Sequence, residues 1–371
     1  MLVVTSSATT SARYAVPLAE YTTLRLGGPA TRLVLADSTE AVVAAVRVAD
    51  ADVELGTGAE VRRPLVLGGG SNVVIADAGV PGTTVLVAST GREVRSAPDG
   101  GIWLSAAAGE DWDIVVAASV AEGFSGLECL SGIPGRVGAV PVQNVGAYGV
   151  EIADLLVDID LYDRRASVVR NHVPAAALEL GYRTSVLKGR VDAVVLRIRL
   201  ALARGGLSGP IRYPELAGAL DVPLGGRAPV TEVREAVLAL RRSKGMVLDP
   251  LDHDTWSVGS FFTNPVVAQG EADRVAMAAG APGSSMPRYP APSGQAKLSA
   301  AWLISQAGFA RGYPGPGGRV SLSRRHTLAL TNRGTGTTED LLKLAREVRD
   351  GVYARFRVRL VPEPVLVGCE L

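Results

Sequence analysis

The sequence has few residues of the kinds that build metal sites and disulfide frameworks. Its two cysteines, Cys129 and Cys369, form no CxxC pair, which favours a reducing, cytoplasmic location. Its three histidines, His172, His253 and His326, are widely separated and lack the spacing of metal ligands. We therefore expect no structural or catalytic metal site.

Long apolar runs and a dominant charge are also missing. The longest apolar candidate, Val191–Ala203, is interrupted by Asp192, Arg197 and Arg199, so we expect no membrane-spanning helix. The N-terminus lacks a basic start followed by an apolar core, which argues against a secretory signal. Lys and Arg total 38 against 37 Asp and Glu, a net charge of +1. No basic field therefore indicates nucleic acid or a membrane as a partner.

The length of 371 residues allows two or three domains. Ser, Thr and Ala dominate the first residues, so residues 1–20 are expected to form a flexible tail. Strands with a few helices are expected over 21–205. The Gly- and Pro-rich segment 205–210 marks a boundary, and a second domain of helices and strands follows over 206–357.

Capping residues and apolar periodicity predict helices in both parts of the chain. They are expected near residues 37–49, 111–122, 231–244, 299–306 and 338–356. A last strand is predicted over 358–367, where Pro362 and Pro364 place it at the edge or the end of a sheet.

One stretch, Ser131–Gly149, is unusually rich in glycine. Five glycines and two prolines in this stretch exclude a regular helix, while valines and Tyr148 supply apolar anchors. Glycine allows a backbone to pass close to another group. We therefore interpret the stretch as one that runs past a large, flat, phosphorylated cofactor.

A second glycine-rich loop, Gly68–Asn72, lies between two predicted strands. The β-branched run Val73–Ile75 follows it, whereas a Rossmann fingerprint or a P-loop would open a helix. Successive backbone N–H groups in such a loop can bind phosphate oxygens. A simple hairpin turn is the alternative, because Gly-Gly is common there.

Six motifs together resemble one family of enzymes. In chain order they are LGGGSNVV, GIPGRVGAVPVQNVGAYG, GYRTSVLK, GSFFTNP, KLSAAWLISQAG and HTLALTN. Their order and joint occurrence are similar to the UDP-N-acetylenolpyruvoylglucosamine reductases of peptidoglycan precursor synthesis, over about residues 23–371. The resemblance implies that NADPH reduces a bound FAD, which then reduces the enolpyruvyl ether of UDP-N-acetylglucosamine to the lactyl ether of UDP-N-acetylmuramate. Both substrates are small molecules, and a monomer or weak oligomer is expected.

The resemblance also implies an α+β fold with two parts. One is a FAD-binding domain of the vanillyl-alcohol-oxidase (PCMH) type, and the other is a smaller α+β domain for the UDP-sugar. Residues 358–371 would form a strand returning to the FAD side. The implied FAD contacts are Leu67, Gly68, Gly69, Gly70, Ser71, Asn72, Val73, Ile133, Pro134, Gly138, Ala139, Gln143, Asn144, Gly146 and Ala147.

Three residues match the family's catalytic positions. Arg183 would polarise the substrate carboxylate through paired hydrogen bonds, Ser260 would donate the proton to the α-carbon, and Glu363 would oppose Arg183 across the enolate as a neutral acid. Without the resemblance, Arg183 reads equally as a surface residue and Ser260 as a turn serine. The family's usual Leu-Glu-Pro-Glu-Val is here Leu-Val-Pro-Glu-Pro, so Val361 departs from the pattern while Glu363 keeps it.

Five further residues match substrate positions: Tyr148, Tyr213, Lys244, Asn264 and Lys297. Tyr213 indicates the long-loop (type I) branch, in which a tyrosine covers the diphosphate. Lysines and amides suit a diphosphate because they neutralise its charge, although Lys244 could instead stabilise the end of its own helix. His326 matches a motif position without an assigned role.

Two other classes of protein stay open on the residues alone. A flavoprotein acting on a different substrate would lack Ser260 and Tyr213 in these contexts. A non-catalytic flavin- or nucleotide-binding module would lose at least one of the three catalytic positions, whereas all three are filled.

Overall fold

The computed structural model describes residues 11–55, 63–280 and 286–371. The chain divides into two compact units. Unit 1 comprises residues 1–17, 29–69 and 80–241, and unit 2 comprises residues 18–28, 70–79 and 242–371. Each unit is therefore assembled from segments that are distant in the sequence.

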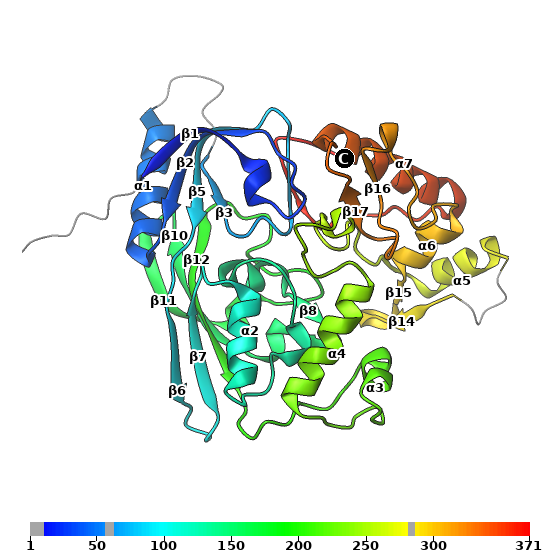
Figure 1. Cartoon of the computed structure of the whole chain (residues 1–371), viewed down its shortest axis with the longest axis horizontal. Helices are drawn as coiled ribbons and strands as arrows, with labels where there is room; N and C mark the ends of the chain where they lie inside the picture. The colour runs from blue at the N-terminus through cyan, green and yellow to red at the C-terminus, as the bar shows by residue number, and fades with distance from the viewer. Residues whose placement is uncertain (1–10, 56–62, 281–285) are drawn as a thin grey trace, which may run out of the picture. The chain divides into compact units, whose positions relative to one another are not determined.

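A four-stranded sheet forms one part of unit 1. Its order is β1 (Ala12–Pro17), β2 (Pro29–Ala36), β5 (Val80–Val87) and β3 (Leu65–Leu67). Strand β1 is antiparallel to β2, whereas β5 runs parallel to both β2 and β3. Helix α1 (Thr39–Leu55) lies beside this sheet (Figure 1), and Val42 and Val46 share a buried cluster with Val34 and Val85.

A five-stranded antiparallel sheet forms the other part of unit 1. Its order is β11 (Val168–Pro174), β10 (Leu156–Asp163), β12 (Ala193–Leu202), β7 (Ile102–Ala107) and β6 (Arg92–Ser96). Helix α2 (Trp112–Ala121) belongs to the same core, where Trp112 is buried and its indole N–H donates to the carbonyl of Leu130 at 3.2 Å.

Short elements complete unit 1. Residues 128–178 contribute η2 (Glu128–Leu130), η3 (Val137–Gln143), β8 (Gly146–Ala147), β9 (Val150–Glu151), η4 (Ile152–Asp154) and η5 (Ala175–Leu178). Helix α3 (Pro214–Ala219) packs on α4 (Val230–Ser243), whose last two residues belong to unit 2. Arg234 of α4 forms two hydrogen bonds of 2.7 and 2.9 Å with Asp113 of α2. This pair ties α4 to the five-stranded part of the unit.

Unit 2 surrounds one large apolar core. Its strands form three small sheets: β4 (Val73–Ile75) with β18 (Val365–Val367); β13 (Val266–Val267), β15 (Ala296–Leu298) and β14 (Arg288–Pro290); and β16 (Val320–Leu322) with β17 (Leu330–Asn332). Its helices are α5 (Gln269–Ala278), α6 (Ala300–Gln306) and α7 (Thr338–Phe356), with η1 (Leu18–Tyr21), η6 (His253–Thr255), η7 (Pro292–Gly294) and η8 (Pro316–Gly318).

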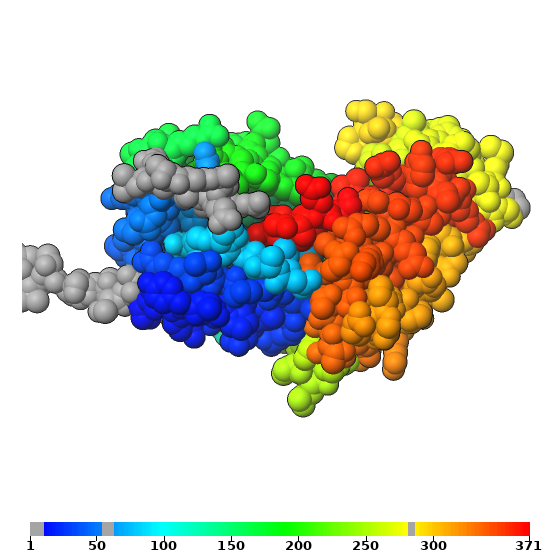
Figure 2. Space-filling view, turned by 90° about the horizontal axis from the view of Figure 1, so that it is seen from above, coloured from blue at the N-terminus to red at the C-terminus, as the bar shows by residue number. Residues whose placement is uncertain are grey.

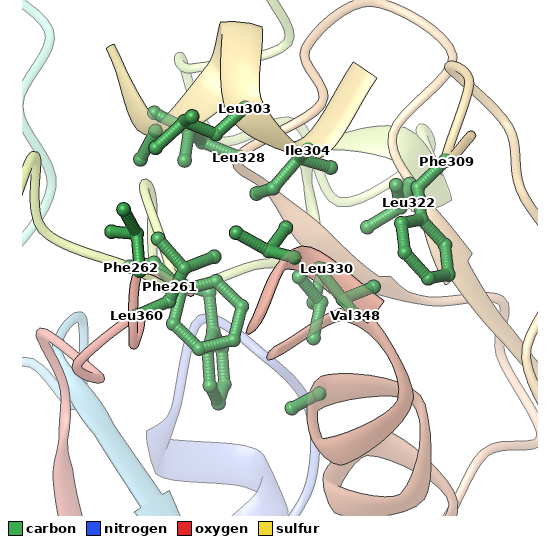
Figure 3. Packing of buried hydrophobic residues seen from close by; sticks show 14 of the residues in the cluster. Phe261, Phe262, Leu303, Ile304, Phe309, Leu322, Leu328, Leu330, Val348 and Leu360 are labelled. Atoms are coloured by element: carbon green, nitrogen blue, oxygen red, sulfur yellow. The ribbon is translucent and has the colours of Figure 1, made fainter. Parts of the chain in front are cut away.

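The core of unit 2 joins its helices to its loops. Figure 3 shows Phe261 and Phe262 beside Leu360, with side chains of α6 and α7 around them. The orange-red surface of the segment containing α7 adjoins the yellow surface of the segment containing α5 (Figure 2), and the two helices are in contact. In the described parts of the chain, no helix combines the length and the apolar character needed to cross a membrane.

Several predicted elements differ from the structure. The expected tail over 1–20 is too long, because residues 12–17 pair with β2 and residues 18–21 form η1; residues 1–10 lie outside the described part. The segment 206–241 packs in unit 1 rather than with the residues that follow it. The last strand is only Val365–Val367, because Pro362 and Pro364 lack the N–H groups that a longer ladder requires.

Helix α7 begins with a capping box whose aspartate, Asp340, also forms an ion pair with Arg319. The amide of Asp340 donates to Thr337 Oγ1 at 3.1 Å, and the amide of Thr337 donates to Asp340 Oδ2 at 3.2 Å. Arg319 donates two hydrogen bonds of 2.7 and 2.8 Å to the same carboxylate. The hydrogen bonds from Arg319 and Thr337 hold the pKa of Asp340 at about 2, down from its ordinary 3.8.

We predict that Asp340→Asn lowers the free energy of unfolding by about 1–2 kcal/mol at pH 7, because it removes a charged cap and its partner. A carboxylate with a lowered pKa stabilises the fold above its unfolded pKa, and the stabilisation is lost as pH falls toward about 2. Urea unfolding at pH 7 and at successively lower pH should show the difference between the proteins shrinking below pH ~4. A constant difference would contradict the assigned cause.

Candidate functional site

The two glycine-rich segments of unit 1 pack backbone against backbone. A Cβ added to Gly69 would lie 2.7 Å from Gly135 Cα, and one added to Gly68 would lie 3.4 Å from Arg136 Cβ. Real Cβ atoms do not approach a backbone atom at 2.7 Å, so Gly69 has no room for a side chain. A close approach is therefore present between the two glycine-rich segments themselves, and the predicted approach to a cofactor stays a prediction.

The segment that contains η3 is fixed in the same way. The amide of Gly138 donates to the carbonyl of Ala108 at 2.8 Å, and a Cβ on Gly138 would lie 2.6 Å from Ala108 Cβ. Gln143, at the end of η3, is buried, and its Oε1 meets no hydrogen-bond partner among the described residues. A buried amide oxygen of this kind suits a ligand that carries N–H or O–H donors, as the ring and ribityl chain of FAD do.

Asn144 follows in the left-handed conformation, with φ of 45°. Its Nδ2 donates to Glu151 Oε2 at 2.8 Å and to the carbonyl of Gly181 at 3.0 Å, and its Oδ1 accepts from the amide of Ala153 at 2.9 Å. The side-chain amide thus joins two other segments of unit 1, residues 151–153 and the turn at Gly181. A contact of Asn144 with the cofactor stays a prediction, and these bonds favour its backbone rather than its side chain.

The remaining residues predicted at the cofactor lie on both sides of the division between units. Leu67 ends β3, Gly146 and Ala147 form β8, and Ile133, Pro134 and Ala139 belong to unit 1. Gly70, Ser71, Asn72 and Val73 belong to unit 2, where the carbonyl of Asn72 accepts from the amide of Val365 at 3.0 Å. The loop after β3 is thereby anchored in unit 2 by the C-terminal strand β18.

Arg183 is held by the glycine-rich stretch of unit 1. Its Nη2 donates to the carbonyl of Gly146 at 2.9 Å, and its φ of 53° is left-handed. The turn that carries it is closed by paired backbone hydrogen bonds of 3.0 and 3.2 Å between Gly181 and Thr184. Lys188 Nζ donates to the carbonyl of Arg183 at 2.9 Å. The bond to Gly146 therefore directs the guanidinium, while the turn and Lys188 hold the backbone of Arg183.

Tyr148 and Tyr213 meet in unit 1. Their ring centroids are 5.4 Å apart at an interplanar angle of 83°, the edge-to-face arrangement. Burial is the main cause that raises the pKa of Tyr148 to about 12, and the charge of Arg241 opposes it in part. Tyr148 therefore stays a neutral hydrogen-bonding group at physiological pH. Tyr213 directly precedes α3 and is 40% exposed, so its ring is accessible.

Unit 2 brings Ser260 and Glu363 onto neighbouring extended segments. The amide of Glu363 donates to the carbonyl of Phe261 at 2.9 Å, and the amide of Thr263 donates to the carbonyl of Val361 at 3.1 Å. On the other side, the amide of Phe261 donates to the carbonyl of Leu328 at 2.7 Å. The segment that begins with Ser260 is therefore held between two others, and Phe261 is fully buried in the core (Figure 3).

The other three predicted substrate residues also belong to unit 2. Lys244 follows directly after α4, and Lys297 lies on β15 between two buried neighbours, Ala296 and Leu298, so that it faces away from the core. Asn264 Oδ1 accepts from the amide of Ala300 at 2.9 Å at the start of α6. This bond orients Asn264 and directs its Nδ2 donor away from the helix.

Sequence reasoning left out some residues that shape this site. Gly135 and Arg136 make the contacts with Gly68 and Gly69, and Glu151 binds Asn144. The glycines of Ser131–Gly149 could have indicated Gly135 and Arg136, because close packing of two backbones requires glycine in at least one of them. No local signal identifies Glu151, since its partner is known only from the fold.

Two family models match the chain. The model described as FAD binding domain matches residues 30–171. The model described as UDP-N-acetylenolpyruvoylglucosamine reductase, C-terminal domain, matches residues 249–367. The first match lies in the part of the chain that contains the packed glycine segments, and the second contains Ser260 and Glu363.

Curated relatives match almost the whole chain. The UDP-N-acetylenolpyruvoylglucosamine reductase of Saccharopolyspora erythraea is 60% identical over 357 residues, covering 95% of each chain. The reductase of the same name from Salinispora arenicola is 52% identical over 355 residues, again covering 95% of each chain.

A solved structure shows the same fold. The UDP-N-acetylenolpyruvylglucosamine reductase from Thermus caldophilus is 24% identical, with a TM-score of 0.61, and the match covers 96% of this chain and 98% of that one. This likeness and the FAD binding domain confirm the predicted α+β fold with a FAD-binding domain of the vanillyl-alcohol-oxidase type. The chain therefore belongs to the UDP-N-acetylenolpyruvoylglucosamine reductase family of FAD-containing oxidoreductases.

Proposed function

We propose that this chain catalyses the NADPH-driven reduction of UDP-N-acetylglucosamine enolpyruvate to UDP-N-acetylmuramate, a step of peptidoglycan precursor synthesis. The observation that carries the proposal is the backbone pairing of the Ser260 and Glu363 segments in a member of this family. The proposal includes a cytoplasmic location, which the two free cysteines Cys129 and Cys369 support.

In this proposal two glycine-rich segments hold the FAD: the stretch Ser131–Gly149 and the loop Gly68–Asn72 after β3. Gly68, Gly69 and Gly138 allow close approach of backbone amides, and the carbonyl oxygen of Gln143 is the acceptor for a flavin donor. When bound, FAD supplies the hydride chemistry between NADPH and the enolpyruvyl double bond. The roles of unit 1 and unit 2 as FAD-binding and substrate-binding parts belong to the same proposal.

Hydride arrives on the carbon β to the substrate carboxylate, so negative charge develops on the α-carbon and the carboxylate. We assign the stabilisation of this charge to Arg183 and Glu363. The bond from Arg183 Nη2 to Gly146 fixes the direction of the guanidinium before substrate binds. A group fixed in advance stabilises charge without reorganising during the reaction.

Ser260 is assigned the proton transfer to the α-carbon. A serine hydroxyl is a weak acid, so it serves only when it is aligned with the nascent carbanion and kept from water. Its neighbours Phe261 and Phe262 are 0% and 1% exposed, and hydrogen bonds hold their segment from both sides. These features support the assignment because they restrict motion at Ser260 and place apolar side chains next to it.

Lys244, Asn264 and Lys297 are proposed to bind the diphosphate and sugar, with Tyr148 and Tyr213 covering them. Cations balance the negative charge of a diphosphate, and cations and amides replace the hydrogen bonds to water that its oxygens lose on binding. The accessible ring of Tyr213 supports membership of the long-loop branch, because such a ring is available to close over a ligand.

The function is tested optically. Purified protein should be yellow, lose its colour when NADPH is added without oxygen, and regain it when UDP-N-acetylglucosamine enolpyruvate follows. UDP-N-acetylglucosamine, which lacks the double bond, is the matched control and should restore no colour. Protein that bleaches but is not reoxidised by the enolpyruvyl compound would exclude the proposed substrate.

The flavin site is tested by Gly138→Val. We expect a folded but colourless protein, because the new Cβ would lie 2.6 Å from Ala108 Cβ and displace η3. The control is Gly209→Val, where a Cβ meets nothing within 4 Å, and it should keep full flavin. Circular dichroism and the ratio of flavin to protein absorbance provide the measurement. A full flavin content in Gly138→Val would argue against this part of the site.

The proton donor is tested by Ser260→Ala. Reduction of the flavin by NADPH should keep its rate, while reoxidation by the enolpyruvyl substrate should slow by about 10²–10⁴-fold, the typical contribution of a positioned proton transfer. Stopped-flow absorbance separates the two half-reactions. Ser305→Ala, at a helix serine bonded to Ala301, is the control. Equal slowing of both half-reactions would contradict the assigned role.

A further inference from the structure

Asp254 is a buried carboxylate at which several segments of unit 2 meet. It is 4% exposed. Its Oδ1 accepts from the amide of Arg324 and from Arg333 Nη1, both at 3.0 Å, and its Oδ2 accepts from Ser323 Oγ at 2.8 Å. Arg325 Nε lies 3.7 Å from Oδ2. Burying a carboxylate is costly unless it is paired in this way, so its position is closely specified.

Arg325 extends this network to the end of helix α4. Its Nη1 donates to the carbonyl of Arg242 at 3.2 Å, and its Nη2 bonds to Asp252. Arg242 lies in the last turn of α4, where carbonyl groups lack partners within the helix. A cation bonded to such a carbonyl stabilises the helix end. Asp252, through a hydrogen bond, and Asp254, at ion-pair distance, therefore hold the Arg325 guanidinium, which in turn bonds to the last turn of α4.

Lys244 follows this turn directly. The next residue, Gly245, is buried in the left-handed conformation with φ of 67°, and its amide donates to the carbonyl of Arg242 at 3.0 Å. A Cβ on Gly245 would lie 3.2 Å from the carbonyl oxygen of Asp254 and 3.6 Å from Arg325 Cδ. The backbone before Lys244 is thus hydrogen-bonded to Arg325, and the backbone after it packs closely against Asp254 and Arg325.

A second branch leads toward Ser260. Ser323 Oγ, which donates to Asp254, accepts from the amides of Arg325 and His326 at 3.0 and 3.1 Å. His326 Nδ1 accepts from the amide of Leu328 at 3.1 Å, and the carbonyl of Leu328 accepts from the amide of Phe261. His326 therefore holds the turn that borders the Ser260 segment.

We propose that Asp254 is a positioning residue for nucleotide binding: through Arg325 and the Arg242 carbonyl, it sets the place from which Lys244 meets the diphosphate of the UDP-sugar. The inference rests on the proposed role of Lys244. According to this inference, nucleotide affinity depends on the buried carboxylate of Asp254, although its negative charge alone would repel the nucleotide. Residues that hold a ligand-contacting group in place contribute to affinity without touching the ligand.

The sign of the charge separates positioning from simple electrostatics. Asp254→Asn removes a negative charge, which by Coulomb attraction alone would strengthen the binding of an anion. Arg325→Met removes a positive charge, which alone would weaken it. Positioning predicts that both variants weaken binding, because Arg325→Met removes the bond to the Arg242 carbonyl and Asp254→Asn removes one of the two carboxylates that hold Arg325 there.

The experiment measures the dissociation constant of UDP by calorimetry on the flavin-loaded protein at fixed salt. We expect Lys244→Ala, Asp254→Asn and Arg325→Met each to weaken UDP binding on the order of tenfold, the scale of a small displacement of a binding group. The double variant of Asp254→Asn with Lys244→Ala should bind no more weakly than Lys244→Ala, since both changes act through one contact. Asp340→Asn is the matched control, because it also removes the charge of a buried aspartate of unit 2 that is paired with an arginine, and it should bind UDP as the unchanged protein does.

Each contrary result has a separate meaning. If Lys244→Ala weakens UDP binding and Asp254→Asn does not, the positioning role is overturned while the proposed role of Lys244 stands. If Lys244→Ala has no effect, the proposed role of Lys244 fails and the inference fails with it. An equal effect of Asp340→Asn would reduce the result to general destabilisation and overturn the inference. Should Asp254→Asn fail to fold, Arg325→Met, at a side chain 38% exposed, is combined with Lys244→Ala instead. If the double variant binds UDP no more weakly than Lys244→Ala, positioning is supported; if the two losses add, the inference is overturned.

Discussion

The contact between two stretches of backbone, Gly68–Gly69 and Gly135–Arg136, is the constraint on which unit 1 depends. A side chain at Gly69 would overlap Gly135, so the two loops meet at this distance only if both lack side chains there. The sequence alone attributes the glycines to a ligand. The structure adds that the loops first shape each other, and a loop that is fixed before binding loses less entropy when the ligand arrives.

Charged residues of both units act at the ends of three helices. Burial alone would raise the pKa of Asp113, but hydrogen bonds from Arg234 and from the amide of Gly132 lower it. Asp340 with Arg319 fixes the start of α7, and Arg325 fixes the end of α4. Replacing both members of such a pair by apolar residues changes stability little, because desolvation offsets their attraction, whereas removing one partner alone is costly. The consequence of these pairs is geometric, since each specifies where a helix begins or ends relative to a neighbouring loop.

The parts of the fold that depend on local signals were predictable. The periodic apolar residues and caps of α2, α6 and α7 led to helix limits within a few residues of the structure. Features that depend on distant partners were not predictable: residues 206–241 join unit 1 through packing of α3 and α4, and residues 12–17 become a strand by pairing with β2. The same limit applies to the site, where no local signal indicated that the side chain of Asn144 binds Glu151 and the carbonyl of Gly181; its contact with the cofactor stays a prediction.

The pairing of the Ser260 and Glu363 segments bears on the proposed proton transfer from Ser260, which is a weak acid. Residues so distant in the sequence meet because Phe261 accepts from Glu363 on one side and donates to Leu328 on the other. Moving Ser260 would therefore break backbone hydrogen bonds and expose Phe261, which is fully buried. A serine gains little as a proton donor from its intrinsic acidity, and much from being held still in a site with little water. The apolar core of unit 2 supplies that restraint, so the demands of packing and of the proposed chemistry coincide at Phe261.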